Sequence, residues 1–158
     1  MITDVQSSTA LWEWNAEVMK QSIEVHEQLL RDSSTRFQGY EIMDEVDSLS
    51  IVFHNAFDAI MYSMMSQKDL MTADWPEELY THDAGSKIGT LYSGLRNRMA
   101  IAVDFTNKFL NRSTNRLSYD GPAVEDRAAI LKAVDAGGIT VCSKETMATL
   151  SQVFPPPA

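Results

Sequence analysis

The segment from Phe37 to Phe53, FQGYEIMDEVDSLSIVF, most constrains how this chain can fold. Two short runs rich in β-branched and aromatic residues, Tyr40–Met43 and Leu49–Phe53, flank an acidic polar stretch. Two strands separated by about five residues predict an antiparallel hairpin. The predicted turn carries three carboxylates, Asp44, Glu45 and Asp47. Such a cluster either binds a hard cation or lies in water as a charged edge, and spacing alone favours the edge.

Length and charge narrow the class of protein. The 158 residues suffice for one domain with a substantial core, which we expect over residues 1–154, followed by a Pro-rich tail at 155–158. A net charge of -9 argues against non-specific binding to nucleic acid or to anionic membranes. The single cysteine, Cys142, excludes an internal disulfide and indicates a reducing compartment.

Hydropathy predicts no membrane insertion by this chain. No run approaches the roughly eighteen consecutive apolar residues of a membrane-spanning helix, and the N-terminus lacks a basic-then-apolar signal pattern. We therefore expect a cytoplasmic protein, or the cytosolic part of a membrane, cytoskeletal or flagellar assembly.

Strand and helix patterns alternate along the chain. Met1–Val5 is typical of a strand, and a helix is predicted from about Ala16, capped by Asn15. Its apolar stripe comprises Met19, Ile23, His26, Leu30 and Phe37. On that stripe, His26 is expected to be a core histidine rather than a ligand. Ser7, Ser8 and Thr9 can cap a helix, or their amides can bind phosphate, and the plain cap is the favoured interpretation.

The second half is predicted to continue this alternation. Asn55 caps a helix whose buried face is expected to consist of Phe57, Ile60, Met61, Met64 and Met65. The remaining expected elements are a surface excursion at 72–94, a strand at 95–103, a polar loop at 104–118, a helix at 122–136, a strand at 139–142 and a helix at 144–153. The loop carries Lys108, Arg112 and Arg116, for which solvation is favoured over an anion site. This order predicts an α/β (α+β) sandwich with helices packed on a mainly antiparallel sheet.

The segment from Thr3 to Trp12, TDVQSSTALW, resembles the opening motif of class III adenylate and guanylate cyclase catalytic domains. The likeness is greatest to fungal and trypanosomatid receptor-type adenylate cyclases. Later blocks that resemble the same family, in the same order, are Gly39–Ser48, Trp75–Glu78, Gly94–Met99 and Tyr119–Ala129. The resemblance implies a ferredoxin-like palm that works as a head-to-tail dimer, here truncated at both ends.

The resemblance also implies a two-metal site. The family's two metal-binding aspartates match Asp4 and Asp47, with the carbonyl of Val5 as a further ligand to Mg²⁺ or Mn²⁺. Two metals can activate the attacking hydroxyl and neutralise the triphosphate during an in-line displacement. The amides of the segment Ser7–Thr9 would then meet phosphate oxygens.

The residues with which the family binds the nucleotide are replaced in this chain. Met43 stands where the family has its base-reading lysine, and Ser118 stands where it has the partner aspartate. Glu125 replaces the ribose-orienting asparagine, and Ala129 replaces the arginine that stabilises the transition state. The glycine before the second aspartate has become Val46. A homodimer of this chain is therefore not expected to make a cyclic nucleotide, and whether it still binds ATP stays open.

Two interpretations follow, both of which require a protein partner. The favoured one is a pseudoenzyme, a cyclase-like domain retained as a dimerising scaffold or as a regulatory or structural partner. The alternative is the metal-bearing half of a heterodimeric adenylate cyclase, which converts ATP to cAMP and pyrophosphate with a partner that supplies the base-reading residues. A third possibility is a fragment that does not function on its own.

Overall fold

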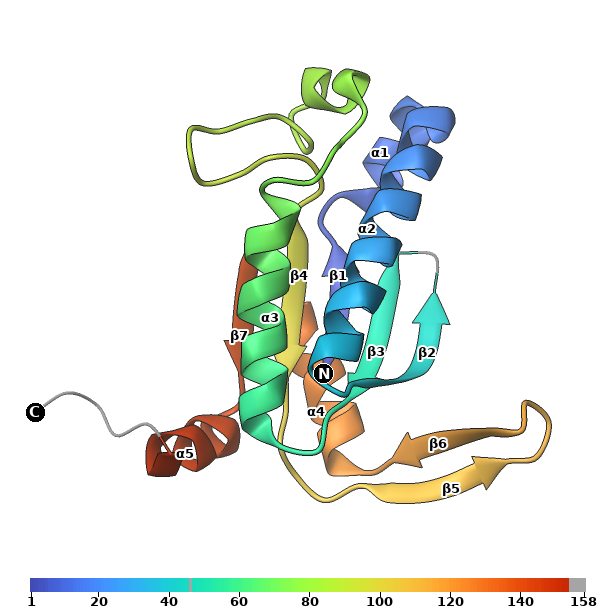
Figure 1. Ribbon diagram of the computed structural model, residues 1–158, viewed down its shortest axis with the longest axis vertical. Helices are drawn as coiled ribbons and strands as arrows, with labels where there is room; N and C mark the ends of the chain where they lie inside the picture. The colour runs from blue at the N-terminus through green and yellow to red at the C-terminus, as the bar shows by residue number, and fades with distance from the viewer. Residues whose placement is uncertain (46, 154–158) are drawn as a thin grey trace, which may run out of the picture.

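The computed structural model describes residues 1–45 and 47–153, with the side chains of residues 43–45 and 153 left out. Val46 and the Pro-rich tail predicted at 155–158 lie outside the described residues. Five strands form one sheet in the order β2-β3-β1-β4-β7, and two further strands form a separate hairpin, β5-β6 (Figure 1). The strands are β1 (Ile2–Val5), β2 (Tyr40–Glu45), β3 (Ser48–Val52), β4 (Asn97–Ile101), β5 (Asn107–Asn111), β6 (Arg116–Asp120) and β7 (Ile139–Cys142). The helices are α1 (Ser8–Trp14), α2 (Ala16–Arg36), α3 (Ala56–Leu70), the short 3-10 helix η1 (Glu77–Thr81), α4 (Pro122–Lys132) and α5 (Lys144–Val153).

The sheet is mainly antiparallel, as predicted. The hairpin β2-β3 forms where predicted, but Asp44 and Glu45 pair within β2 rather than lying in the turn. The strand β1 pairs antiparallel with both β3 and β4. Only the β4–β7 pair within this sheet is parallel, and the chain connects these strands through α4. Because β1 is the central strand, its last residues lie beside the turn of the β2-β3 hairpin.

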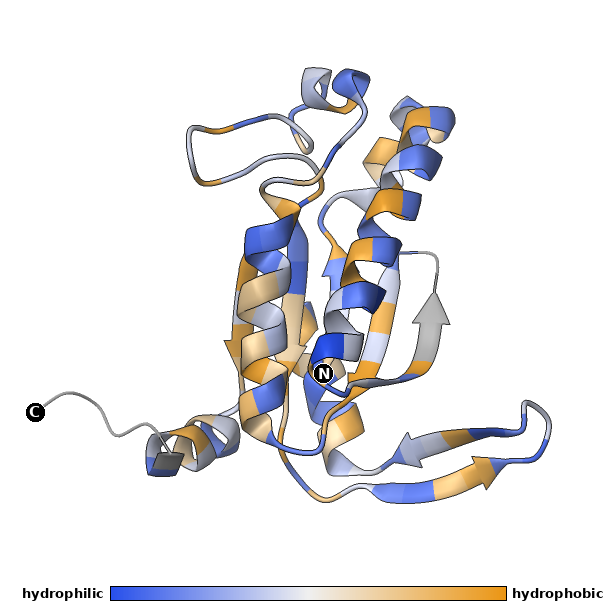
Figure 2. Ribbon diagram, viewed as in Figure 1, coloured by the Kyte–Doolittle hydropathy of each residue, from blue (hydrophilic) through white to orange (hydrophobic). Residues whose placement is uncertain are grey.

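Helices cover both faces of the sheet. Figure 1 shows α2 and α3 side by side on one face and α4 on the other. Figure 2 shows hydrophilic and hydrophobic residues alternating along the ribbons of α2 and α3. Four of the five residues of the predicted α2 stripe, Met19, Ile23, His26 and Leu30, are buried, whereas Phe37 is the C-cap residue after the helix and is half-buried. Burying such side chains contributes about 1.5–3 kcal/mol each, which makes α2 the main support of this face.

The buried face of α3 differs from the prediction. Phe57 and Met64 are exposed, and the residues that face the interior are Ala56, Ala59, Tyr62, Ser63, Ser66 and Leu70. Most of these side chains are small, so α3 packs closely against α2 and β4. A pattern search that assigns the largest apolar residues to the core selects the wrong face of such a helix.

The N-terminal helix and the 72–94 segment also depart from expectation. A separate helix, α1, precedes α2, so the first helix begins at Ser8 rather than near Ala16. The 72–94 segment is irregular around η1, as predicted, but it is not wholly superficial. Trp75 and Leu79 are buried in one apolar cluster with Leu11 of α1. This cluster joins the segment to the body of the domain.

The segment 104–118, predicted as a polar loop, instead contains β5 and the start of β6. These two strands form an arm that extends away from the sheet (Figure 1). Its turn is closed by the Asn111 side chain, whose Oδ1 accepts hydrogen bonds from the amides of Ser113 and Thr114. The arm escaped prediction because its strands are largely exposed and so lack a buried apolar alternation.

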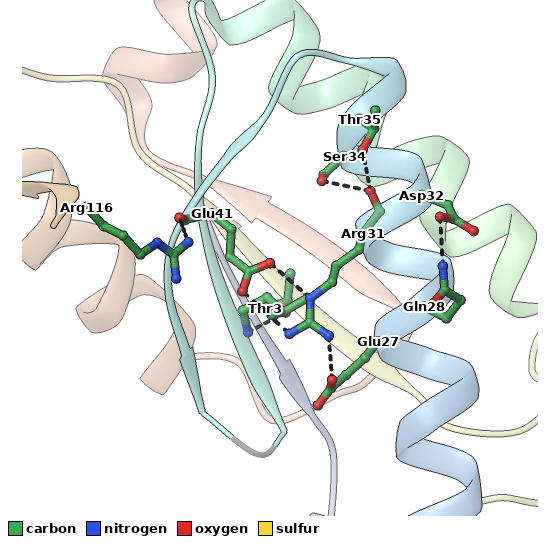
Figure 3. A network of polar contacts seen from close by, with 10 residues as sticks. Thr3, Glu27, Gln28, Arg31, Asp32, Ser34, Thr35, Glu41 and Arg116 are labelled. Carbon is green, nitrogen blue, oxygen red and sulfur yellow. Dashed lines mark hydrogen bonds and ion pairs between the residues drawn. The ribbon is translucent and has the colours of Figure 1, made fainter. Parts of the chain in front are cut away.

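A polar network fastens the β2-β3 hairpin to α2 and to the arm (Figure 3). Arg31 of α2 donates to Glu27 at 2.6 Å and to Glu41 of β2 at 3.0 Å, and Arg116 of β6 donates to the Glu41 carbonyl at 2.7 Å. The hydrogen bonds to Glu41 raise the pKa of Arg31, so this cation stays charged at all ordinary pH values. The network holds the strand that leads into the acidic turn.

Among the described residues, no helix is both long enough and apolar enough to cross a membrane.

Candidate functional site

The residues predicted to bind metal come from the end of β1 and from the β2-β3 turn, which lie next to each other. The amide of Val5, at the end of β1, donates a hydrogen bond of 3.2 Å to the carbonyl of Asp47 in the β2-β3 turn. Asp4 precedes this contact by one residue, and both aspartates are partly exposed. The fold therefore brings Asp4 and Val5 next to Asp47, which follows them by more than forty positions in the sequence.

The carboxylate of Asp4 already has a cationic partner. Asp4 and Arg98 occupy opposite positions of the β1–β4 ladder, and the Arg98 guanidinium forms an ion pair with the Asp4 carboxylate. The Asp4 side chain is only 20% exposed, and that of Arg98 is 25% exposed. A second guanidinium nitrogen of Arg98 donates to the Val134 carbonyl at 2.8 Å. This tether holds the arginine over the sheet face that carries Asp4.

The metal implied by the resemblance fits these residues only in part. Carboxylate and carbonyl oxygens are suitable ligands for Mg²⁺ or Mn²⁺. However, the guanidinium neutralises Asp4, and the described residues include no group of three or more His, Cys, Asp or Glu side chains arranged to hold a metal ion. As arranged, the site does not fit a divalent metal at Asp4.

The predicted phosphate-binding turn is tied to the segment that connects α4 to β7. Ser7 adopts a left-handed conformation, with φ of 59°, immediately before Ser8 and Thr9 begin α1. Gln6 anchors this turn, because its side chain accepts from the Gly137 amide at 3.0 Å and donates to the Asp135 carbonyl at 3.2 Å. Ser7 occupies the N-cap position, but its side chain makes no capping hydrogen bond. The first amides of α1 lack acceptors within the helix and so face outward.

His26 of α2 lies in the core, as predicted. It is 1% exposed, and neither ring nitrogen has a partner of hydrogen-bonding geometry among the described residues. Burial lowers its pKa to about 4, and the nearby Asp47 charge and Asn97 side chain oppose this shift only in part. The ring is therefore neutral near neutral pH.

Asn97 is a site residue that the sequence analysis missed. It is fully buried at the start of β4, and its Oδ1 accepts a hydrogen bond of 3.2 Å from the Asp4 amide. Its carbonyl accepts from the Gly138 amide at 2.8 Å and from the Gln67 side chain at 2.9 Å. In the sequence, Asn97 could have been recognised as a polar residue among the positions of the predicted strand that face the core.

The substituted nucleotide positions lie on β2, β6 and α4. The Met43 side chain is outside the described residues, although the Met43 backbone in β2 pairs with Ser50 of β3. Ser118 lies in β6 opposite Phe109 of the arm. The next residue, Tyr119, packs near Tyr40 of β2, with ring centroids 6.3 Å apart. The two base-reading positions therefore belong to neighbouring strands.

Glu125 and Ala129 share the exposed face of α4, four residues apart. Arg127, between them in sequence, lies on the opposite face and is 6% exposed. It donates at 3.1 Å to the Val124 carbonyl and at 3.1 Å to the Met1 carbonyl, and burial lowers its pKa. The α4 arginine is thus part of the packing between α4 and the residue that precedes β1.

Comparisons with known proteins bear on the family and the fold of the chain. No protein-family model matches the chain. The chain is 31% identical over 158 residues to the adenylate cyclase of Schizosaccharomyces pombe, an alignment that covers 97% of this chain but 9% of that protein. In structure it is similar to a Trypanosoma brucei adenylate cyclase crystallised in its monomeric state, with a TM-score of 0.84, 21% identity, and 93% of this chain and 72% of that chain covered. It is also similar to the guanylyl cyclase Cya2, with a TM-score of 0.71, 14% identity, and 94% and 75% of the two chains covered.

The chain spans less than a tenth of the length of the fungal relative. Its sequence is similar to adenylate cyclases over almost all of its own length, and its fold is that of adenylate and guanylate cyclase domains. The chain is therefore a class III nucleotide cyclase-like domain.

Proposed function

We propose that this cyclase-like domain does not form cyclic nucleotides as a homodimer and acts through protein contacts, as a dimerising scaffold or as a regulatory or structural partner. The observation that carries the proposal is the composition of the exposed face of α4. That face presents Glu125 and Ala129, while Arg127 is buried against β1.

The magnitudes favour a large loss of catalysis. A positioned arginine that stabilises the transition state of phosphoryl transfer contributes about 10³–10⁵ in rate. A carboxylate such as Glu125 at roughly 5 Å from a triphosphate adds about 3 kcal/mol of repulsion per unit charge at an effective dielectric constant near 20. Both changes act in the same direction, so a self-pair would be slower than an ordinary cyclase by several orders of magnitude.

The arm supports the contact role. Phe109 and Leu110 of β5 are 46% and 54% exposed, and Phe105, two residues before β5, is 68% exposed. Phe109 and Leu110 are consecutive in β5, so they present apolar surface on both faces of the hairpin, and exposed apolar side chains on a protruding segment indicate protein contact. A cyclase-like partner, either a second copy or a different chain, would cover this surface.

Two measurements test the proposal. The first is a cyclase assay of the purified chain with ATP and with GTP in Mg²⁺ or Mn²⁺, in which we expect no cyclic product. The second is analytical ultracentrifugation across concentrations, in which we expect self-association that the double variant Phe109→Asp/Leu110→Asp weakens. Thr114→Asp, which adds a charge at the exposed tip of the arm, is the matched control and should leave association unchanged. Cyclic product at an ordinary enzymatic rate would contradict the proposal.

One observation favours the alternative role as the metal-bearing half of a heterodimeric cyclase. The Val5–Asp47 hydrogen bond keeps Asp4 and Asp47 close together even though the nucleotide-gripping side chains are replaced. The test is to mix the chain with a cyclase-like protein from the same source. Cyclic AMP formed only in the mixture, and lost on Asp47→Asn, would establish the heterodimer and reject the scaffold role.

A further inference from the structure

The ion pair between Asp4 and Arg98 is set by the strand register rather than by a flexible surface contact. Asp4 and Arg98 are directly opposite each other in the β1–β4 ladder, so both side chains project from the same face of the sheet. That face is the one covered by α4. The Arg98 side chain therefore leaves the sheet next to the Asp4 side chain, whichever rotamer it adopts.

The guanidinium is held from a second side. Its other terminal nitrogen donates to the Val134 carbonyl at 2.8 Å, in the segment that follows α4. Arg96, two residues earlier on the chain, provides a contrast. It donates to the Asp83 carbonyl at 2.9 Å, and its guanidinium lies 4.8 Å from the centroid of the Tyr92 ring, so it neutralises no carboxylate by direct contact. The two neighbouring arginines thus have different roles, and only Arg98 reaches the predicted metal position.

A tethered cation and a divalent metal compete for the same carboxylate. Asp4 offers two oxygens, and a guanidinium already paired with them weakens the electrostatic attraction of the carboxylate for a hard metal ion. We infer that Arg98 occupies the place of the cation at Asp4 and keeps the Asp4–Asp47 pair closed to divalent metal in the isolated chain. This inference rests on the proposed function in treating Asp4 and Asp47 as inherited metal positions. It adds a specific cause for the loss of metal, separate from the loss of the nucleotide-gripping residues.

The test is a direct Mn²⁺ titration followed by the electron paramagnetic resonance signal of the free ion, without nucleotide. Wild-type protein should bind Mn²⁺ weakly, and Asp4→Asn should not weaken that binding further. Arg98→Gln should bind Mn²⁺ at least about tenfold more tightly, and Asp4→Asn in the Arg98→Gln background should abolish the gain. Arg96→Gln, which removes the same charge from the same strand region, is the matched control and should resemble the wild type.

Two outcomes would overturn the inference. One is wild-type binding of Mn²⁺ as tight as that of Arg98→Gln, and the other is a loss of wild-type Mn²⁺ affinity on Asp4→Asn. The second requires no change at Arg98, so it decides the question even if Arg98→Gln fails to fold, which circular dichroism would reveal. Because the titration contains no nucleotide and measures no product, its result is independent of the cyclase and association tests above.

Discussion

Replacing His26 with leucine is expected to remove about 2 kcal/mol of the stability that the fold loses between about pH 7.5 and pH 5. The buried amino group of Met1, whose pKa burial lowers to about 5, also contributes to that loss and is left in place by the substitution. His26 is fully buried, and burial lowers its pKa to about 4 from the ordinary value of 6.5. Because the pKa is lower in the folded state, the unfolded chain binds more protons between these two values. The free energy of unfolding therefore decreases as the pH falls from 6.5 toward 4.

The size of this effect follows from the shift. A difference of roughly 2.5 pKa units corresponds to about 3 kcal/mol, of which about 2 kcal/mol is lost between roughly pH 7.5 and pH 5. This is a large part of the stability of an ordinary domain, which is about 5–15 kcal/mol. The nearby Asp47 charge opposes the shift and is already included in the value of about 4.

Urea denaturation at about pH 7.5 and at about pH 5 measures the effect for the wild type, His26→Leu and His54→Gln. His54 is exposed, so its replacement is the control and should leave the pH dependence unchanged. His26→Leu carries its own packing cost, but this cost is the same at both pH values and cancels in the difference. An equal pH dependence in the wild type and in His26→Leu would refute the reasoning.

Three further predictions test the fold and the site. Gly94→Ala is expected to lower the free energy of unfolding by more than about 3 kcal/mol, because Gly94 has φ of +74° and a Cβ there would collide with the Trp75 ring. Gly89→Ala is the comparison, since Gly89 has φ of +52° but open space around it, and should lower the free energy of unfolding by only about 1 kcal/mol. Urea denaturation measures both. Glu41→Gln should lower stability by about 1 kcal/mol, less at high salt, and a double-mutant cycle with Arg31→Gln should show coupling between the two sites. No single restoration of the four replaced nucleotide positions should give cyclic product from the homodimer, because residues that act as a unit do not contribute additively; product from one restoration alone would contradict this.

The sequence was informative where a local pattern and the tertiary contacts agreed. The β2-β3 hairpin and the stripe of α2 were predicted from alternation and helical spacing, because their apolar residues are the ones that the fold buries. The nearness of Asp4 and Asp47 came from the resemblance alone. No local pattern indicates that the end of β1 and a turn some forty positions later will meet.

The failures have physical causes. The arm has few buried side chains, so its strands are specified by pairing with each other and by the Asn111 turn rather than by a core face. The face of α3 was chosen wrongly because its interior consists of small residues, and the outward Met64 carries the stronger apolar signal. The Asp4–Arg98 ion pair depends on the register between two strands more than ninety residues apart, which periodicity does not reveal.

The hydrogen bonds of Asn97 link three parts of the chain through one residue. Its side chain holds the Asp4 amide, and its carbonyl receives both the Gly138 amide and the Gln67 side chain. Local opening at the start of β4 would therefore release the acidic end of β1 and the connection to β7 in a single event. The amide protons of Asp4 and Gly138, although far apart in sequence, should then exchange with solvent at matched free energies, as one cooperative unit of the native state.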